Sequence, residues 1–195
     1  MTHDKYDAGL SRNPANFTPL SPLTFLRRAA KVFPDNIAII HGDQRTSYRD
    51  FYRRCRQLGS ALEQAGIGKG DTVAIMSPNA PAMLEAHYGV PMTGAVLNTL
   101  NVRLDAATIA FTLDHGEAKV LLTDREFSQT IKEALVQAKS KPLVIDIDDA
   151  LAEGGNLIGE TDYESFIATG DPEFSWSLPA DEWDAISLNY TSGTT

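Results

Sequence analysis

The sequence predicts an α/β fold in which a mainly parallel sheet is flanked by helices. Short apolar runs without polar alternation occur at residues 72–76, 95–100 and 143–147, as in strands that are covered on both faces. Between these runs lie longer segments whose apolar residues recur at steps of three and four, as in amphipathic helices. Strands that alternate with such helices favour a parallel sheet between two helix layers.

A helix over about residues 48–65 is the first well-specified element. Its apolar residues form one stripe: Phe51, Cys55, Leu58, Leu62 and Ala65. Ser47 and Asp50 have the spacing of an N-terminal capping pair, and Gly66 supplies a left-handed end. The sequence therefore specifies both ends of this helix.

The same alternation of strand and helix continues along the chain. The expected strands are 72–76, 95–100, 120–122 and 143–147, and the expected helices are 81–93, 104–115 and 127–138. Pro91 should disturb the helix over 81–93, because proline has no N–H to donate. Residues 148–184 are acidic and lack periodicity, which predicts a surface excursion with one short helix near 163–168. Trp176 and Trp183 are expected to pack its return against the body.

The end of the sequence has the pattern of a phosphate-binding loop. A buried strand over residues 185–190 is expected to lead into Thr191, Ser192, Gly193, Thr194 and Thr195. Glycine permits conformations in which consecutive N–H groups converge on an anion, and open parallel sheets bind ligands at the carboxyl ends of their strands. A flexible polar tail has a similar composition and remains an alternative. The Gly-Lys pair of a Walker loop is absent from this segment.

Composition limits the classes of partner. The 195 residues, 43% hydrophobic and 22% charged, are typical of one soluble globular domain. The net charge of −9 disfavours nucleic acid, and no apolar run approaches the roughly 18 residues of a membrane span. The single cysteine, Cys55, is expected to be a buried small hydrophobe in a reducing compartment, so the expected location is cytoplasmic.

Other polar residues favour structural interpretations. Asp146, Asp148 and Asp149 carry the oxygen ligands that Mg²⁺ takes, but strands also commonly end at aspartate, and that interpretation is favoured. The other candidate ligands are three histidines. They have neither the spacing of metal ligands nor an acidic residue at a spacing that would indicate a pair, and they are expected to be surface or core residues: His41, His87 and His115.

Five segments occur in the order of a known superfamily. They are TSYRDF at 46–51, GIGKGDTVAIMSPN at 66–79, GAVLNTLNVRL at 94–104, DHGE at 114–117 and NYTSGTT at 189–195. Together they resemble the adenylate-forming superfamily, which includes acyl-CoA synthetases, luciferases and nonribosomal peptide adenylation domains. The segment 98–104 is most similar to acyl-CoA synthetases that use short, medium or aryl acids. In the family the last segment continues through a glycine, a proline and a lysine.

The resemblance implies a two-stage reaction. A carboxylate attacks the α-phosphorus of ATP to give an acyl-adenylate and pyrophosphate, and the thiol of coenzyme A (CoA) then displaces AMP. Carried over to this sequence, residues Thr191–Thr195 would contact the β- and γ-phosphates, and the Thr191 hydroxyl would also face Mg²⁺. The family's adenine-stacking aromatic, ribose-binding aspartate, magnesium-binding glutamate and C-terminal lysine have no matching positions in the sequence, so no catalytic residue is assigned.

These expectations describe residues 1–195 as part of an N-terminal adenylation domain that stops within the phosphate-binding loop, with the C-terminal domain absent. Such a piece is expected to be inactive alone. Many members of the superfamily are dimers, so the resemblance is compatible with a homodimer, although the sequence does not specify an oligomeric state. Two alternatives remain: another adenylate-forming enzyme, such as a carrier-protein loader or an aryl-acid ligase, and a non-catalytic α/β binding module.

Overall fold

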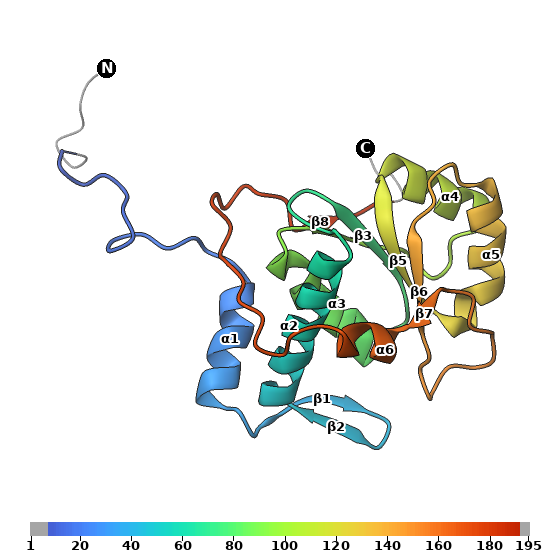
Figure 1. The fold of residues 1–195 in the computed structure, drawn as a ribbon, viewed down its shortest axis with the longest axis horizontal. Helices are drawn as coiled ribbons and strands as arrows, with labels where there is room; N and C mark the ends of the chain where they lie inside the picture. Colours follow the sequence, from blue (N-terminus) through green and yellow to red (C-terminus); the bar gives the residue numbers. More distant parts are fainter. Residues whose placement is uncertain (1–7, 192–195) are drawn as a thin grey trace.

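The computed structural model describes residues 8–191, and its centre is a parallel sheet of six strands between helices (Figure 1). The strand order is β7-β6-β5-β3-β4-β8, and each neighbouring pair is parallel. The bounds are β3 Thr72–Met76, β4 Val96–Thr99, β5 Ala118–Asp124, β6 Leu143–Ile147, β7 Thr161–Asp162 and β8 Ser187–Leu188. The predicted α/β class with a parallel sheet is confirmed.

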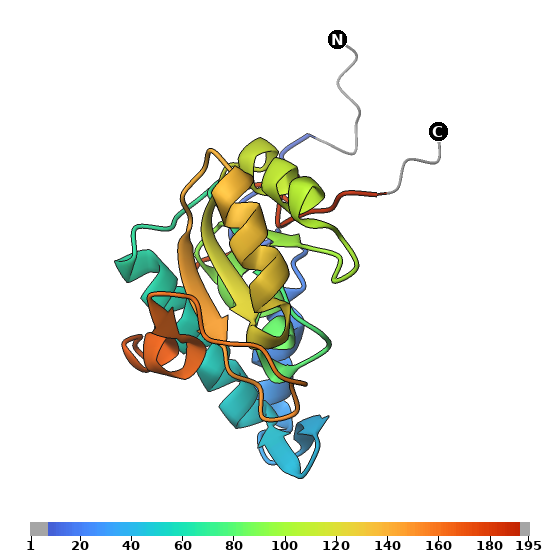
Figure 2. The same ribbon diagram turned by 90° about the vertical axis from the view of Figure 1, so that its right-hand side faces the viewer.

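Helices cover both faces of this sheet (Figure 2). On one face lie α2 (Tyr48–Gln64), α3 (Pro81–Met92) and α6 (Tyr163–Ala168), and on the other lie α4 (Ala106–His115) and α5 (Ser128–Gln137). Alternate residues of β3 separate the two cores: Val73 and Ile75 pack toward α2 and α3, whereas Ala74 and Met76 pack toward α4 and α5. A strand that is buried on both faces explains the apolar run over Thr72–Met76.

The predicted helix ends of α2 are present. The Ser47 hydroxyl accepts a hydrogen bond from the Asp50 N–H at 3.2 Å, and Gly66 follows the helix with a φ of +82°. In α3, Pro91 lies in the last turn and the helix ends at Met92, so the disturbance expected from this proline is confined to that turn.

Elements outside the sheet pack against its α2 side. Helix α1 (Leu23–Val32) contacts α2, and β1 (Ile37–His41) pairs with β2 (Gln44–Ser47) in an antiparallel hairpin that the sequence pattern does not predict. Of the two tryptophans, Trp176 packs as expected: its indole N–H donates to the Tyr52 hydroxyl at 3.0 Å. The expectation for Trp183 is wrong, because Trp183 is 93% exposed.

The last strand is shorter and more exposed than the sequence predicts. A buried strand over 185–190 is wrong: β8 comprises Ser187 and Leu188, with Ser187 exposed and Leu188 half-buried. The reason is its position, because within residues 8–191 this strand has one neighbour, β4. None of the helices in that part of the chain has the length and apolar character needed to cross a membrane.

Candidate functional site

The segment that leads into the proposed phosphate loop lies at the carboxyl edge of the sheet. β8 runs parallel to β4, with Asn98 opposite Leu188, and the Leu97 N–H donates to the Ile186 carbonyl at 3.0 Å. Since all strands of the sheet are parallel, the chain leaves β8 at the edge where the other strands also end. Thr191 follows Leu188 by three residues and is exposed.

Thr191 is the one predicted loop residue in the part of the chain that the structure describes. Ser192, Gly193, Thr194 and Thr195 lie outside the described residues, so their assignment to phosphate stays a prediction. What the structure describes is the attachment of the loop, namely the residues immediately before Thr191 and their contacts.

Both residues before Thr191 are bonded to other elements. The Thr99 hydroxyl at the end of β4 donates to Oδ1 of Asn189 at 3.1 Å. The Tyr190 hydroxyl lies 2.8 Å from Nδ1 of His115, the last residue of α4, and the two share a hydrogen bond. Partial burial raises the pKa of the Tyr190 phenol. The chain is thus bonded to β4 and to α4 just before the loop begins.

Two rings of α4 and the ring of Tyr190, which lies two residues past β8, meet at this place. His115 stacks on Phe111 at 5.3 Å between ring centroids with an interplanar angle of 20°. Tyr190 presents its ring edge-on to both, at 5.8 Å from His115 and 6.4 Å from Phe111. Tyr190 and His115 are 75 positions apart, so no local sequence pattern could reveal this contact.

Gly116, the residue after α4, fits against β8. A Cβ atom added at Gly116 would lie 3.2 Å from Cδ2 of Leu188, 3.3 Å from Nδ2 of the buried Asn98 and 3.0 Å from the Thr112 carbonyl oxygen. These distances are tighter than ordinary packing, so the missing side chain allows Leu188 to approach the end of α4.

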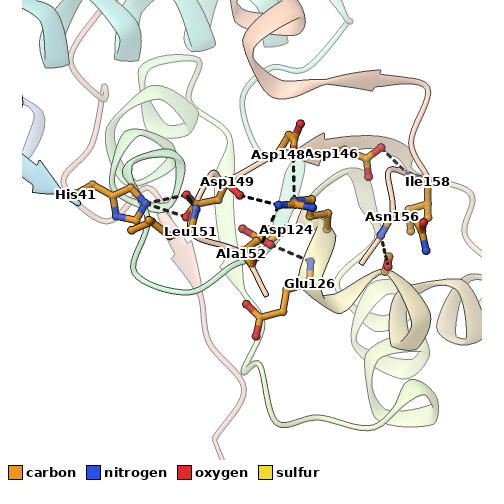
Figure 3. Close-up of polar contacts among 12 residues, drawn as sticks. His41, Asp124, Glu126, Asp146, Asp148, Asp149, Leu151, Ala152, Asn156 and Ile158 are labelled. Atoms are coloured by element: carbon orange, nitrogen blue, oxygen red, sulfur yellow. Dashed lines mark hydrogen bonds and ion pairs between the residues drawn. The ribbon is translucent and has the colours of Figure 1, made fainter. Parts of the chain in front are cut away.

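A second polar cluster lies near the carboxyl ends of β5 and β6 (Figure 3). Nε2 of His41 lies 2.8 Å from Oδ1 of Asp149, and Nε of Arg125 lies 2.9 Å from Oδ1 of Asp148. Burial opposes the charge on Asp149, but the hydrogen bonds from the Leu151 N–H and from His41 outweigh it and lower the pKa of this carboxyl. The cluster ties the β1–β2 hairpin to the segment after β6.

The other carboxylates of the cluster hold loop backbone. Oδ2 of Asp146 accepts hydrogen bonds from the N–H groups of Ile158 and Gly159, at 2.7 and 2.6 Å. Asp124 accepts from the Glu126 N–H at 2.9 Å, and burial raises the pKa of Asp124. Among residues 8–191, no group of three or more His, Cys, Asp or Glu side chains is placed to hold a metal ion. These contacts support the structural interpretation of the acidic run.

An apolar groove of about 500 Å³ borders β8 on the side of α3 and the hairpin. Its walls include Ile40 of β1, Leu84 and Tyr88 of α3, and Ile186 next to β8. The polar lining residues are His41, Asn79, His87 and Ser187, but the lining is mainly apolar and suits an apolar group. The groove therefore suits a different kind of ligand from the polar segment that begins at Thr191.

Comparison with known proteins gives a consistent result. Residues 26–195 match the family described as AMP-binding enzyme. The chain is 48% identical to an acetate/butyrate–CoA ligase of Arabidopsis thaliana that is named as peroxisomal, and 47% identical to an acetate–CoA ligase of Humulus lupulus. Each alignment covers 95% of this chain and 35% of the relative, so the chain spans about a third of the length of the curated relatives it matches.

Solved structures share the fold. An anthranilate CoA ligase in complex with anthranoyl-AMP superposes with a TM-score of 0.82 at 20% identity, covering 94% of this chain and 35% of that one. A benzoate CoA ligase from Burkholderia xenovorans LB400 gives a TM-score of 0.69 at 21% identity, covering 81% and 30%. The family match extends over most of the sequence and agrees with the observed sheet. The chain therefore belongs to the AMP-binding enzyme family.

Proposed function

We propose that the intact protein is an AMP-forming acyl-CoA synthetase. A carboxylate oxygen attacks the α-phosphorus of ATP and pyrophosphate leaves; the CoA thiol then attacks the acyl carbon, loses its proton and expels AMP. The observation that carries this proposal is the match over residues 26–195 together with an exposed Thr191 just past a strand at the carboxyl edge of the sheet. The names of both plant relatives specify acetate, which makes short carboxylic acids the first substrates to test.

The phosphate site of this enzyme would be the segment Thr191–Thr195. Four hydroxyl side chains and one glycine provide donors for the β- and γ-phosphates, and a chain with a net charge of −9 needs such local donors to hold an anionic nucleotide. The exposed Thr191 hydroxyl is an oxygen ligand of the kind that Mg²⁺ accepts beside phosphate oxygens. When bound, Mg²⁺ neutralises the charge that develops on the phosphates.

The wider organisation is part of the same proposal. Residues 1–195 would be the first part of an N-terminal adenylation domain, the remaining nucleotide, acyl and CoA contacts would come from later residues, and the intact enzyme would form a homodimer. A cytoplasmic location accords with the single cysteine, Cys55, which is buried and free. The peroxisomal label in the name of one relative makes the peroxisome the alternative location.

A different adenylate-forming enzyme remains the second candidate. A carrier-protein loader transfers the acyl group to a protein-bound thiol, and an aryl-acid ligase selects a different acid. Membership of the AMP-binding enzyme family argues against the other alternative, a non-catalytic α/β binding module. The thiol acceptor and the acid are therefore the variables that an assay must separate.

The experiment is carboxylate-dependent exchange of pyrophosphate into ATP by the full-length gene product, followed by thioester formation with CoA. Acetate and butyrate should support both steps, and exchange without CoA transfer would instead favour a carrier-protein loader. Thr191→Val should lower exchange roughly 10- to 100-fold, since it removes one hydrogen bond to a charged group. Thr18→Val, which alters an exposed threonine in the segment before α1, is the matched control. An intact protein with no exchange for any acid would refute the proposal.

A further inference from the structure

β8 is a weak support for the segment that it carries. It is two residues long, and within residues 8–191 it pairs only with β4. A pairing this short leaves the direction of the following residues poorly fixed, because few ladder hydrogen bonds restrain them. Other contacts must therefore orient the chain between Leu188 and Thr191.

The last turn of α4 supplies such contacts. Along an extended chain, alternate residues project to the same face, so Leu188 and Tyr190 lie on one side of the segment. The end of α4 meets both: Gly116 leaves room for Leu188, and His115 hydrogen-bonds to the Tyr190 hydroxyl at 2.8 Å. Leu188 and Tyr190 thus pack against two consecutive residues: Gly116, which follows α4, and His115, the last residue of α4.

Rings make the His115 contact directional. The stack on Phe111 fixes the plane of the imidazole, and the edge-on packing of Tyr190 places its hydroxyl at Nδ1. Asn189, which lies between Leu188 and Tyr190 in the chain, is bonded to Thr99 of β4. Thr191 therefore follows a residue whose side chain is held at its far end by α4.

We propose that His115 is a positioning residue for the nucleotide: through Tyr190 it sets the direction in which the chain leaves the sheet at Thr191. This inference rests on the proposed function, because it gives a role to a loop that is itself proposed to bind ATP. A purely structural hydrogen bond would affect stability alone. A positioning bond changes the affinity for MgATP and leaves the affinity for the carboxylic acid unchanged.

The test uses the full-length protein, three single variants at this contact and one double variant. Tyr190→Phe removes the hydroxyl but keeps the ring, His115→Ala removes the imidazole, and His115→Asn retains an amide group able to bond the phenol. We expect Tyr190→Phe and His115→Ala each to raise the KM for MgATP about tenfold, as small misplacements of positioning groups do, with the KM for the acid unchanged. His115→Asn should recover most of the MgATP affinity. The double variant Tyr190→Phe/His115→Ala should have a KM for MgATP no higher than that of either single variant, because both substitutions remove the same hydrogen bond.

Tyr52→Phe is the matched control, since it also removes a tyrosine hydroxyl that bonds to one side chain, Trp176, but on α2. It should leave the KM for MgATP unchanged. The same variants are also compared by equilibrium binding of MgATP in the absence of acid, measured by calorimetry, so that the inference does not depend on turnover.

MgATP affinities within about twofold of wild type in both Tyr190→Phe and His115→Ala would overturn the inference, as would an equal rise in the KM values for MgATP and acid. Failure of the proposed function looks different: the wild-type protein binds MgATP but exchanges no pyrophosphate, and calorimetry on the variants then still decides the role of His115. A wild-type protein that binds no MgATP would overturn both.

Discussion

Nε of Arg54 on α2 lies 2.5 Å from Oε1 of Glu85 on α3, and the Glu85 side chain is almost completely buried. The Tyr163 hydroxyl at the start of α6 donates to the other carboxylate oxygen at 2.8 Å, and Arg54 also bonds Glu164. Burial raises the pKa of Glu85, and the bonds from Arg54 and Tyr163 partly offset this effect. One carboxylate thus joins the three helices on this face of the sheet.

Replacing Arg54 should therefore be costly. Arg54→Ala leaves the Glu85 carboxylate buried without its cation, and we expect the free energy of unfolding to fall by about 3–5 kcal/mol. Arg53→Ala is the matched control one position earlier: its guanidinium is half-exposed and 3.6 Å from Asp50, so the loss should stay below about 1 kcal/mol. Urea unfolding measures both, and equal losses would show that the buried pair contributes no more than the surface pair.

The close approach of α2 and α3 gives a second prediction. A Cβ atom on Gly89 would lie 2.7 Å from Cδ2 of Leu58 and 2.9 Å from the Cys55 carbonyl oxygen. Gly89→Ala should lower stability by roughly 1–2 kcal/mol, because overpacking against backbone outweighs the better helix propensity of alanine. Gly68→Ala meets no atom within 4 Å and should leave the melting temperature unchanged or slightly raised. A neutral Gly89→Ala would mean that the two helices separate at little cost.

The His41–Asp149 contact predicts a dependence on pH. The folded pKa of Asp149 lies below its ordinary value of 3.8, so its stabilising contribution is fully present above that value and is lost as pH falls through the folded pKa. The difference in unfolding free energy between wild type and Asp149→Asn should therefore shrink as the pH falls below about 4. Urea titrations from pH 7 to about pH 3 measure it. A gap that widens in acid would contradict the assignment.

Periodicity predicted the elements whose burial is simple. Helix α2 has one apolar stripe, and β3 is covered on both faces, so each carries a pattern that depends only on its own residues. The β1–β2 hairpin was missed because Ile37 and Ile40 are exposed while Ile39 packs inward, which gives an apolar run without useful alternation. β8 was predicted too long because its apolar residues lie at an exposed edge.

The residues of the candidate site also differ in whether a local sequence pattern could reveal them. Thr191 is proposed from a local motif. In contrast, the contact between Tyr190 and His115 joins residues 75 positions apart, and the pair of His41 with Asp149 joins residues 108 apart. Neither pair has a spacing that a helix or strand period would produce. Contacts of this kind depend on how α4 and β6 are placed by the whole sheet, and only the fold reveals them.

Residues 1–195 alone should catalyse no carboxylate-dependent exchange of pyrophosphate into ATP. The chain spans 35% of its plant relatives, and the resemblance assigns adenine, ribose and magnesium contacts to residues that the sequence does not contain. Within residues 8–191, β8 also has one neighbouring strand, so the segment before Thr191 is supported from one side of the sheet. The full-length protein, assayed at the same concentration, is the control, and circular dichroism should show that the short chain keeps its helices. Exchange by the short chain above the rate without carboxylate would mean that the loop and its α4 support suffice to bind and orient ATP.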